Sequence, residues 1–203
     1  MKKLLATWVV LALGGVAQAN LLYNGDLSIE GTDQWNADGW SEYNSGGWVN
    51  REIAANGTYG DPNNWHYAIG NAGAINNGAY QDIAVPDNGA IVSLSADIAM
   101  DDWWKPDGFV KIEFYDATDT LISFNETYLY ANGYDGDVAQ PWQPINISAP
   151  APAGTVKVRA VLGSYTASDG GTVRFDNAVL VPEPASMGLL TAGVLMIAGR
   201  RRA

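Results

Sequence analysis

Two stretches of the chain concentrate aromatic and polar side chains that could bind a ligand. Residues 48–67 mix tryptophan and tyrosine with asparagine and aspartate, and residues 101–105 read Asp-Asp-Trp-Trp-Lys. Aromatic rings stack on the apolar C–H faces of sugars, while amides and carboxylates bind sugar hydroxyls. Asparagine and glycine favour turns, so we expect these rings to be exposed in loops. The candidate ligand-binding residues are Trp65, Tyr67, Trp103 and Trp104.

The residue types give little support for catalysis. The chain has no cysteine and a single histidine, His66, which excludes thiol chemistry, disulfides and multi-histidine metal sites. No nucleophile elbow, P-loop or dinucleotide fingerprint occurs. Two carboxylates about 5–9 Å apart would suit glycoside hydrolysis, but an acidic chain brings such pairs together by chance. We therefore expect a protein that is not an enzyme and has no catalytic residues.

The net charge of the chain limits the classes of partner that it can bind. There are 22 acidic and 11 basic residues, which gives a formal net charge of -11 and argues against a nucleic-acid binder. Five of the basic residues lie at the two ends of the chain, so the region between them is more acidic still. Such a body favours solubility, divalent cations and neutral sugars over anionic polymers.

The N-terminus has the pattern of a secretory signal peptide. Two lysines precede an uncharged apolar run from Leu4 to Val16, and Ala17-Gln18-Ala19 forms a small-residue cleavage site. We expect residues 1–19 to be a signal peptide that forms a helix, and the mature chain to begin at Asn20.

The C-terminus carries a second three-part signal. Pro182-Glu183-Pro184 is followed by an uncharged stretch, residues 185–199, and then by three arginines, Arg200, Arg201 and Arg202. A helix over residues 185–199 would rise about 22 Å, a marginal membrane span with its arginines on the cytoplasmic side. The pattern predicts a tail that holds an exported precursor at the inner membrane.

This tail resembles the PEP-CTERM sorting signal of Gram-negative bacteria. The resemblance implies recognition by an exosortase-type sorting enzyme and an association with exopolysaccharide production. It also implies a membrane-anchored precursor that is delivered to the cell surface or the extracellular matrix.

The body between the signals, residues 20–181, reads as strands. Apolar and polar residues alternate over residues 90–99, 109–115, 155–162 and 171–177, with turn residues between these runs. Alternation with one wet face predicts an all-β fold of antiparallel sheets, a β-sandwich or jelly roll. We expect a single domain over residues 20–181, followed by the sorting signal over 182–203. Trp35, Trp40 and Trp142 are expected to lie in its core.

Several pieces of the body resemble carbohydrate-binding-module-like jelly rolls of the galactose-binding type. These are the opening Asn-Leu-Leu-Tyr-Asn-Gly-Asp-Leu of residues 20–27, the Gly39-Trp40 pair and the closing Phe-Asp-Asn-Ala of residues 175–178. In that family the first and last strands often hold a structural Ca²⁺, which implies Asp26, Glu30 and Asp176 as candidate ligands. Where the family often has a glutamate, this chain has Ser28.

These observations together predict an exported protein that binds polysaccharide without catalysis. A structural matrix protein with no specific ligand is the first alternative. A carbohydrate-active hydrolase that uses two carboxylates is the second.

Overall fold

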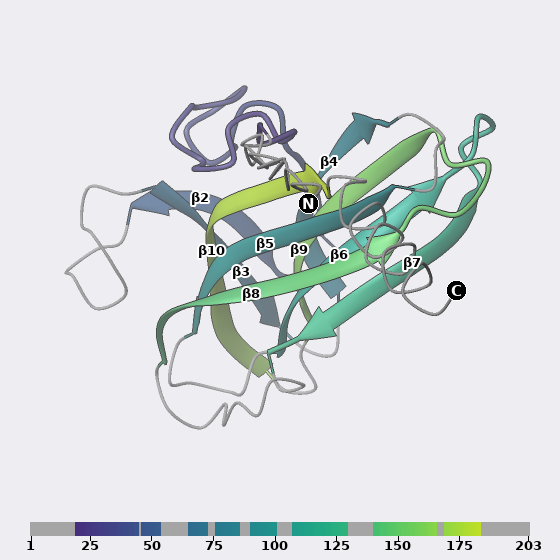
Figure 1. Ribbon diagram of the computed structural model, residues 1–203. Coiled ribbons are helices and arrows are strands. Elements are labelled where there is room, and N and C mark those ends of the chain that lie inside the picture. Colours follow the sequence, from purple (N-terminus) through teal and green to yellow (C-terminus); the bar gives the residue numbers. More distant parts are fainter. Residues whose placement is uncertain are drawn as a thin grey trace, which may run out of the picture.

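The alternating residues form two antiparallel sheets that pack face to face (Figure 1). The computed structural model describes residues 19–44, 46–53, 65–72, 76–85, 90–100, 107–129, 140–165 and 169–183. The predicted helices of the two terminal signals lie outside these ranges. Within the described ranges no helix has the length and apolar character needed to cross a membrane.

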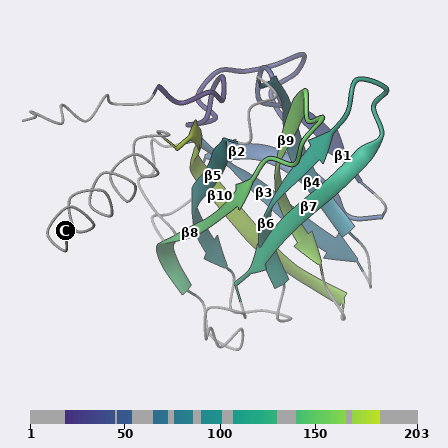
Figure 2. The same ribbon diagram turned by 45° about the vertical axis from the view of Figure 1, so that its right-hand side comes forward.

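Each sheet has five strands, and Figure 2 shows the two layers side by side. The first sheet contains, in spatial order, β1 (Ser41–Tyr43), β4 (Asn76–Ala84), β9 (Lys157–Tyr165), β6 (Asp107–Tyr115) and β7 (Leu121–Tyr128). The second contains β2 (Trp48–Ile53), β3 (Trp65–Ala72), β10 (Asp169–Pro182), β5 (Ile91–Met100) and β8 (Gln140–Pro150). The predicted all-β sandwich is confirmed.

The core lies between the sheets and consists of the inward residues that the alternation predicts. On β5 these include Leu94 and Ile98, and on β6 they include Ile112 and Phe114, all at most 1% exposed. Because successive strand residues point to opposite faces, burial of this set forces the residues between them outward. The charged residues of β6 and β9 therefore share the outer face of the first sheet.

The expectation that residues 48–67 form a loop is wrong at both ends. β2 begins at Trp48 and β3 begins at Trp65, and the two strands pair in register from Trp48 opposite Gly70 to Ile53 opposite Trp65. Gly70 makes this pairing possible, because a Cβ there would lie 2.0 Å from the Trp48 ring. Packing between strands here outweighs the low strand propensity of asparagine and glycine.

Of the three tryptophans expected in the core, one is placed as predicted. Trp40 is 8% exposed, and its indole N–H donates to the carbonyl of Asn24. Trp35 is 51% exposed, so its expected burial is wrong. It lies in the irregular segment before β1, where no strand pleat directs it inward. Trp142 is half-buried on β8.

The N-terminal segment is organised by the side chain of Asn24. Its amide nitrogen donates to the carbonyls of Ile29 and Asp38 at 2.9 and 3.0 Å, and its amide oxygen accepts from the Ile29 N–H at 2.9 Å. Asn24 also has a positive φ of 52°, a conformation that asparagine tolerates better than most residues. One residue thus supplies both the hydrogen bonds and the turn of this segment.

Replacement of Asn24 by alanine is predicted to lower the free energy of unfolding by about 3 kcal/mol, because buried main-chain groups lose their partners. A fall of that size corresponds to about 10 °C in the melting temperature, measured by calorimetry. Asn24→Gly should cost less, since glycine keeps the positive φ without strain. Asn146→Ala on the exposed face of β8 is the control and should change little. Equal melting temperatures for Asn24→Ala and the control would contradict the assignment.

Candidate functional site

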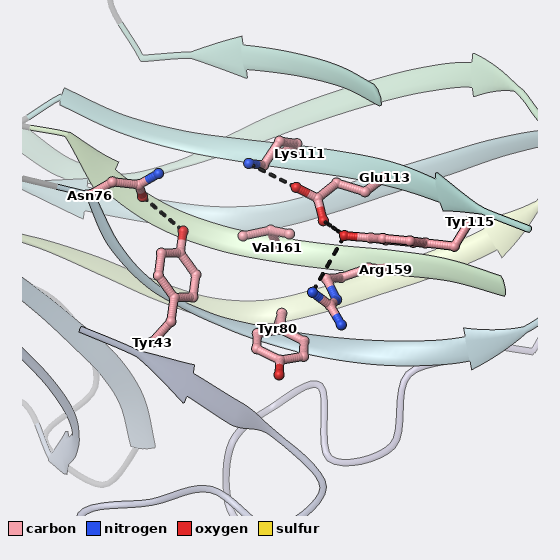
Figure 3. A pocket seen from close by; sticks show the side chains of 8 residues that line it. All are labelled: Tyr43, Asn76, Tyr80, Lys111, Glu113, Tyr115, Arg159 and Val161. Atoms are coloured by element: carbon pink, nitrogen blue, oxygen red, sulfur yellow. Dashed lines mark hydrogen bonds and ion pairs between the residues drawn. The ribbon is translucent and has the colours of Figure 1, made fainter. Parts of the chain in front are cut away.

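The outer face of the first sheet carries a pocket of about 350 Å³ (Figure 3). Side chains from four strands line it, and three of these side chains are tyrosines. The lining residues are Tyr43, Asn76, Tyr80, Lys111, Glu113, Tyr115, Arg159 and Val161. We refer to this surface, together with Asp82 beside it, as the tyrosine groove. The groove residues of β4, β6 and β9 occupy outward positions, and the alternate residues Ala79, Ile112 and Leu162 lie in the core.

Arg159 lies at the centre of the groove. Its guanidinium makes a bidentate ion pair with Asp82, with Nε–Oδ1 at 2.6 Å and Nη2–Oδ2 at 2.9 Å. The guanidinium carbon lies 3.9 Å from the ring centroid of Tyr80 and 5.1 Å from that of Tyr115. The hydrogen bond from Arg159 lowers the pKa of Asp82, and the same bond raises the pKa of Arg159. Both groups are therefore charged at physiological pH.

A chain of polar contacts continues from Arg159 along β6, as the dashed lines of Figure 3 show. Its Nη1 donates to the Tyr115 hydroxyl at 3.4 Å, and that hydroxyl donates to Glu113 at 2.6 Å. The second carboxylate oxygen of Glu113 lies 3.0 Å from Lys111 Nζ. Burial, followed by the hydrogen bond to Glu113, raises the pKa of Tyr115 to about 12, so its hydroxyl stays protonated.

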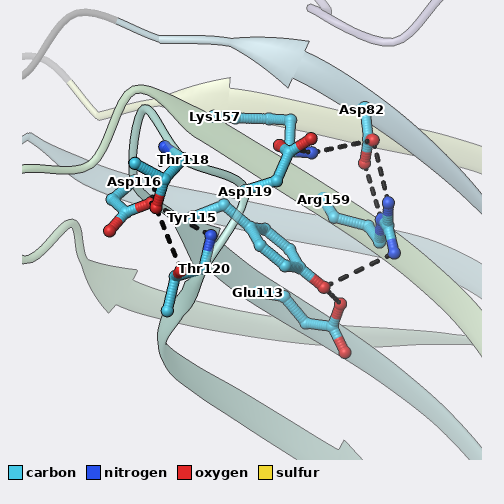
Figure 4. Close-up of polar contacts among 9 residues, drawn as sticks. All are labelled: Asp82, Glu113, Tyr115, Asp116, Thr118, Asp119, Thr120, Lys157 and Arg159. Carbon is cyan, nitrogen blue, oxygen red and sulfur yellow. Dashed lines mark hydrogen bonds and ion pairs between the residues drawn. The ribbon is translucent and has the colours of Figure 1, made fainter.

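The turn between β6 and β7 fixes one end of the groove (Figure 4). Asp116 accepts hydrogen bonds from the main-chain N–H groups of Thr118 and Thr120 at 2.8 and 3.0 Å. The hydrogen bond from the Thr118 hydroxyl, followed by these two main-chain bonds, lowers the pKa of Asp116. Asp119 then reaches Lys157 Nζ at 2.6 Å, and Nζ lies 4.6 Å from the ring centroid of Tyr115.

A second group of aromatic rings lies on the same face, further along β9 and β6. The rings of Phe109 and Tyr165 stack with centroids 4.5 Å apart, and Tyr128 packs against both at 5.8–5.9 Å. Gly163 leaves room for Phe109, because a Cβ there would lie 2.2 Å from the ring. Phe109 is fully buried, so the half-buried Tyr128 and Tyr165 supply the aromatic surface that continues the face beyond the pocket.

The groove pairs each of its cations with an acid. Lys111 contacts Glu113 and Arg159 contacts Asp82, so the local charges cancel. A ligand in the groove would therefore contact aromatic surface flanked by hydrogen-bond donors and hydrogen-bond acceptors. Such a surface can bind a flexible neutral molecule that has both apolar and hydroxyl faces.

Of the four predicted ligand-binding residues the structure describes two, Trp65 and Tyr67, and both lie on β3 of the second sheet, outside the groove. Tyr67 is fully buried between the sheets, where its hydroxyl accepts a hydrogen bond from the Ala37 N–H at 2.9 Å. It therefore has no surface for a ligand. Trp65 is half-buried, and the Arg51 guanidinium lies 3.6 Å from its ring centroid. Trp103 and Trp104 lie outside the described residues.

The three predicted metal ligands have different surroundings. Asp176 is 3% exposed; burial raises its pKa to about 7, and the negative charges of Asp97 and Asp26 add to this effect. Glu30 is exposed, and its charge acts on Arg51 instead. Among the described residues, no three acidic or histidine side chains are arranged to hold a metal ion.

His66 is a buried residue with a structural role. It is 1% exposed, its Nε2 lies 3.3 Å from Glu52 Oε1, and its ring packs edge-on against Trp142 with centroids 5.8 Å apart. A histidine covered in this way has no access to a substrate.

The sorting motif begins inside the folded body. β10 ends at Pro182, and Glu183 follows it directly. Pro184 and the three arginines lie outside the described residues.

Comparison with known proteins confirms both resemblances. Residues 180–202 match the PEP-CTERM protein-sorting motif, so the chain is an exported protein that is sorted to the cell envelope or surface. No curated protein sequence matches the chain.

Solved structures share the fold. The CBM22-1 xylan-binding domain of Xyn10C from Paenibacillus barcinonensis is 12% identical, with a TM-score of 0.54 and coverage of 82% of this chain and 96% of that one. A family 16 carbohydrate binding module is 21% identical, with a TM-score of 0.51 and coverage of 80% and 99%. The enzymatically active domain of tailspike protein 4 from bacteriophage CBA120 is 13% identical, with a TM-score of 0.57 and coverage of 81% of this chain and 21% of that one. The chain thus has the jelly-roll fold of carbohydrate-binding modules and spans about a fifth of the tailspike.

The groove was missed by reasoning from sequence, although a signal for it was present. The alternation of apolar and polar residues in the sequence already places Lys111, Glu113 and Arg159 on the solvent-facing side of their strands. Tyr115 occupies an outward position on the same strand as Lys111 and Glu113. An aromatic residue at the outward positions of a charged strand indicates a binding face rather than a solvated one.

Proposed function

We propose that this exported protein binds a neutral polysaccharide in the tyrosine groove and does not cleave it. The observation that supports this function is the row of tyrosines around Arg159, each supplied by a different strand. The four strands that line the groove span about 14 Å across, which is room for about three sugar residues. A carbohydrate-binding-module fold and a sorting signal linked to exopolysaccharide agree with this function.

The groove favours binding over hydrolysis. A glycosidase needs a carboxylic acid whose pKa is raised so that it can protonate the leaving group. Asp82 has the opposite property, because the Arg159 hydrogen bond lowers its pKa. Glu113 is already bound by Lys111 and by the Tyr115 hydroxyl. These acids serve as fixed hydrogen-bond acceptors.

The pairing of charges favours neutral polymers. An anionic polysaccharide would have to compete with Asp82 and Glu113 for the groove cations and would meet an acidic body. Retention by a neutral polysaccharide should therefore change little with salt, whereas binding through free cations would weaken steeply.

Affinity electrophoresis in gels that contain xylan, β-glucan, galactan or alginate tests the groove. Tyr80→Ala and Tyr115→Ala should each weaken retention by a neutral polysaccharide about tenfold, because each removes one stacking surface. Tyr23→Ala is the matched control, since Tyr23 is 52% exposed and lies outside the groove.

Three outcomes would contradict the proposal. Retention that is equal in the groove variants and in the control would move the site elsewhere. No retardation in any gel would favour the structural matrix protein without a specific ligand. Release of reducing ends, abolished by Asp82→Asn, would support the hydrolase instead.

We propose that sorting is carried out by an exosortase-type enzyme at the inner membrane of a Gram-negative bacterium. The support is the match of residues 180–202 together with the predicted signal peptide and membrane helix. Processing would release the body to the cell surface or matrix.

We also propose a structural Ca²⁺ beside Asp26 and Asp176. Carboxylates and main-chain carbonyls are the ligands that this ion prefers, and the first and last segments of the body meet here. The Asp26 charge acts on the buried Asp176 carboxyl, so a divalent cation between them would favour its ionised form. Glu30 is not included, because its charge acts on Arg51.

Calcium and pH should act on stability together. Without calcium, the raised pKa of Asp176 means that protonation stabilises the fold, fully below about pH 4, and that this gain is lost as the pH rises through about 7. Added Ca²⁺ should therefore raise the melting temperature most above pH 7, by about 3 °C or more at saturating ion. Asp176→Asn should abolish the calcium shift, and Glu30→Gln should keep it. A melting temperature that is unchanged between EDTA and Ca²⁺ at pH 8 would exclude the site.

A further inference from the structure

The last strand of the chain, β10 at the centre of the second sheet, contains the start of the sorting motif. The motif match begins at Leu180, which is fully buried in the core and pairs with Leu94 of β5. The pairing continues through Val181 opposite Ser93 and Pro182 opposite Val92. No linker therefore separates the folded body from the motif.

Glu183, the acidic residue of the motif, is held on the body by main chain and side chain alike. Its N–H donates to the carbonyl of Ile91 at 2.6 Å. Its carboxylate oxygen Oε1 accepts hydrogen bonds from the hydroxyls of Ser93 at 2.6 Å and Ser148 at 3.5 Å. The two hydroxyls lie 2.6 Å apart on adjacent strands, β5 and β8. Ser93 and Ser148 thus form a hydroxyl pair that faces one carboxylate.

The position of Pro182 fits a motif that continues the strand. The hydrogen bond from Glu183 N to Ile91 O makes residues 183 and 91 a hydrogen-bonded pair, so Pro182 and Val92 form a non-hydrogen-bonded pair. Proline lacks an N–H but loses no bond to β5 at such a position.

The other side of β10 is held by the first residues of the mature chain. The Asn20 side chain donates to the Ala178 carbonyl and accepts from the Leu180 N–H, both at 2.9 Å. The Leu21 N–H adds a bond to the Leu180 carbonyl at 2.8 Å. In Figure 1 the purple N-terminal segment lies beside the yellow-green end of β10. The end of this strand is therefore fixed from both sides.

We propose that Ser93 and Ser148 hold the sorting motif on the folded body, and that residues 181–183 must leave β5 before the sorting enzyme can process the tail. An enzyme that reads Pro-Glu-Pro needs access to the Glu183 carboxylate and to the extended main chain around it. Both are engaged in the folded protein. Ser93 and Ser148 are therefore positioning residues that slow processing, an inference that rests on the proposed sorting function.

The test measures the rate of tail removal from the full chain in cells that carry an exosortase. Wild type and variants are compared by pulse-chase, and loss of the tail is detected as a mobility shift. The variant Ser93→Ala/Ser148→Ala should be processed about fivefold faster, because the loss of hydrogen bonds to a charged group favours release of the motif. Ser95→Ala is the matched control, since Ser95 lies one pair further along the same face of β5, opposite Asn146. The pair Ser93→Thr/Ser148→Thr keeps both hydroxyls and should restore the wild-type rate.

A second readout needs no enzyme. Hydrogen exchange of the Glu183 amide in the purified full chain should be faster in the double alanine variant than in the wild type and in Ser95→Ala. Unchanged exchange would overturn the proposed contact, and so would a processing rate equal to or below that of the wild type. If the wild type itself is not processed in these cells, the sorting function fails instead.

Discussion

The ion pair between Arg159 and Asp82 holds together the face on which the proposed function depends. Arg159 stands at the middle of the first sheet, where an unpaired guanidinium would repel Lys157 and Lys111. Its bidentate contact with Asp82 fixes the plane of the guanidinium, and the rings of Tyr80 and Tyr115 pack against it. The tyrosines therefore have a rigid support, and stacking on a ligand costs them little conformational freedom.

The pleat of β9 joins the core to the groove. Val158, Ala160 and Leu162 face inward and are buried, so Arg159 and Val161 must face outward. A shift of register by one residue would bury the guanidinium and expose the core, which is why the groove cannot slide relative to the fold. The same alternation thus determines stability and binding.

The sequence alone predicted β5, β6, β9 and part of β10 and missed β2 and β3. β5 and β6 could be read because their apolar and polar residues alternate cleanly. β2 and β3 could not, because asparagine, glycine and tryptophan occupy positions that are stabilised only by neighbouring strands. The groove was missed for a related reason. Tyr43, Tyr80 and Tyr115 lie far apart in sequence, and only the order β1-β4-β9-β6 brings them together.

Chemical-shift mapping of the isotope-labelled exported protein tests the central claim most directly. The protein would be titrated with fragments of a neutral polysaccharide that retains it in affinity gels. The largest changes should fall on outward residues of β4, β6 and β9, among them Tyr80, Lys111 and Arg159. Changes confined to the outer face of the second sheet, or to residues 101–106, would contradict the account.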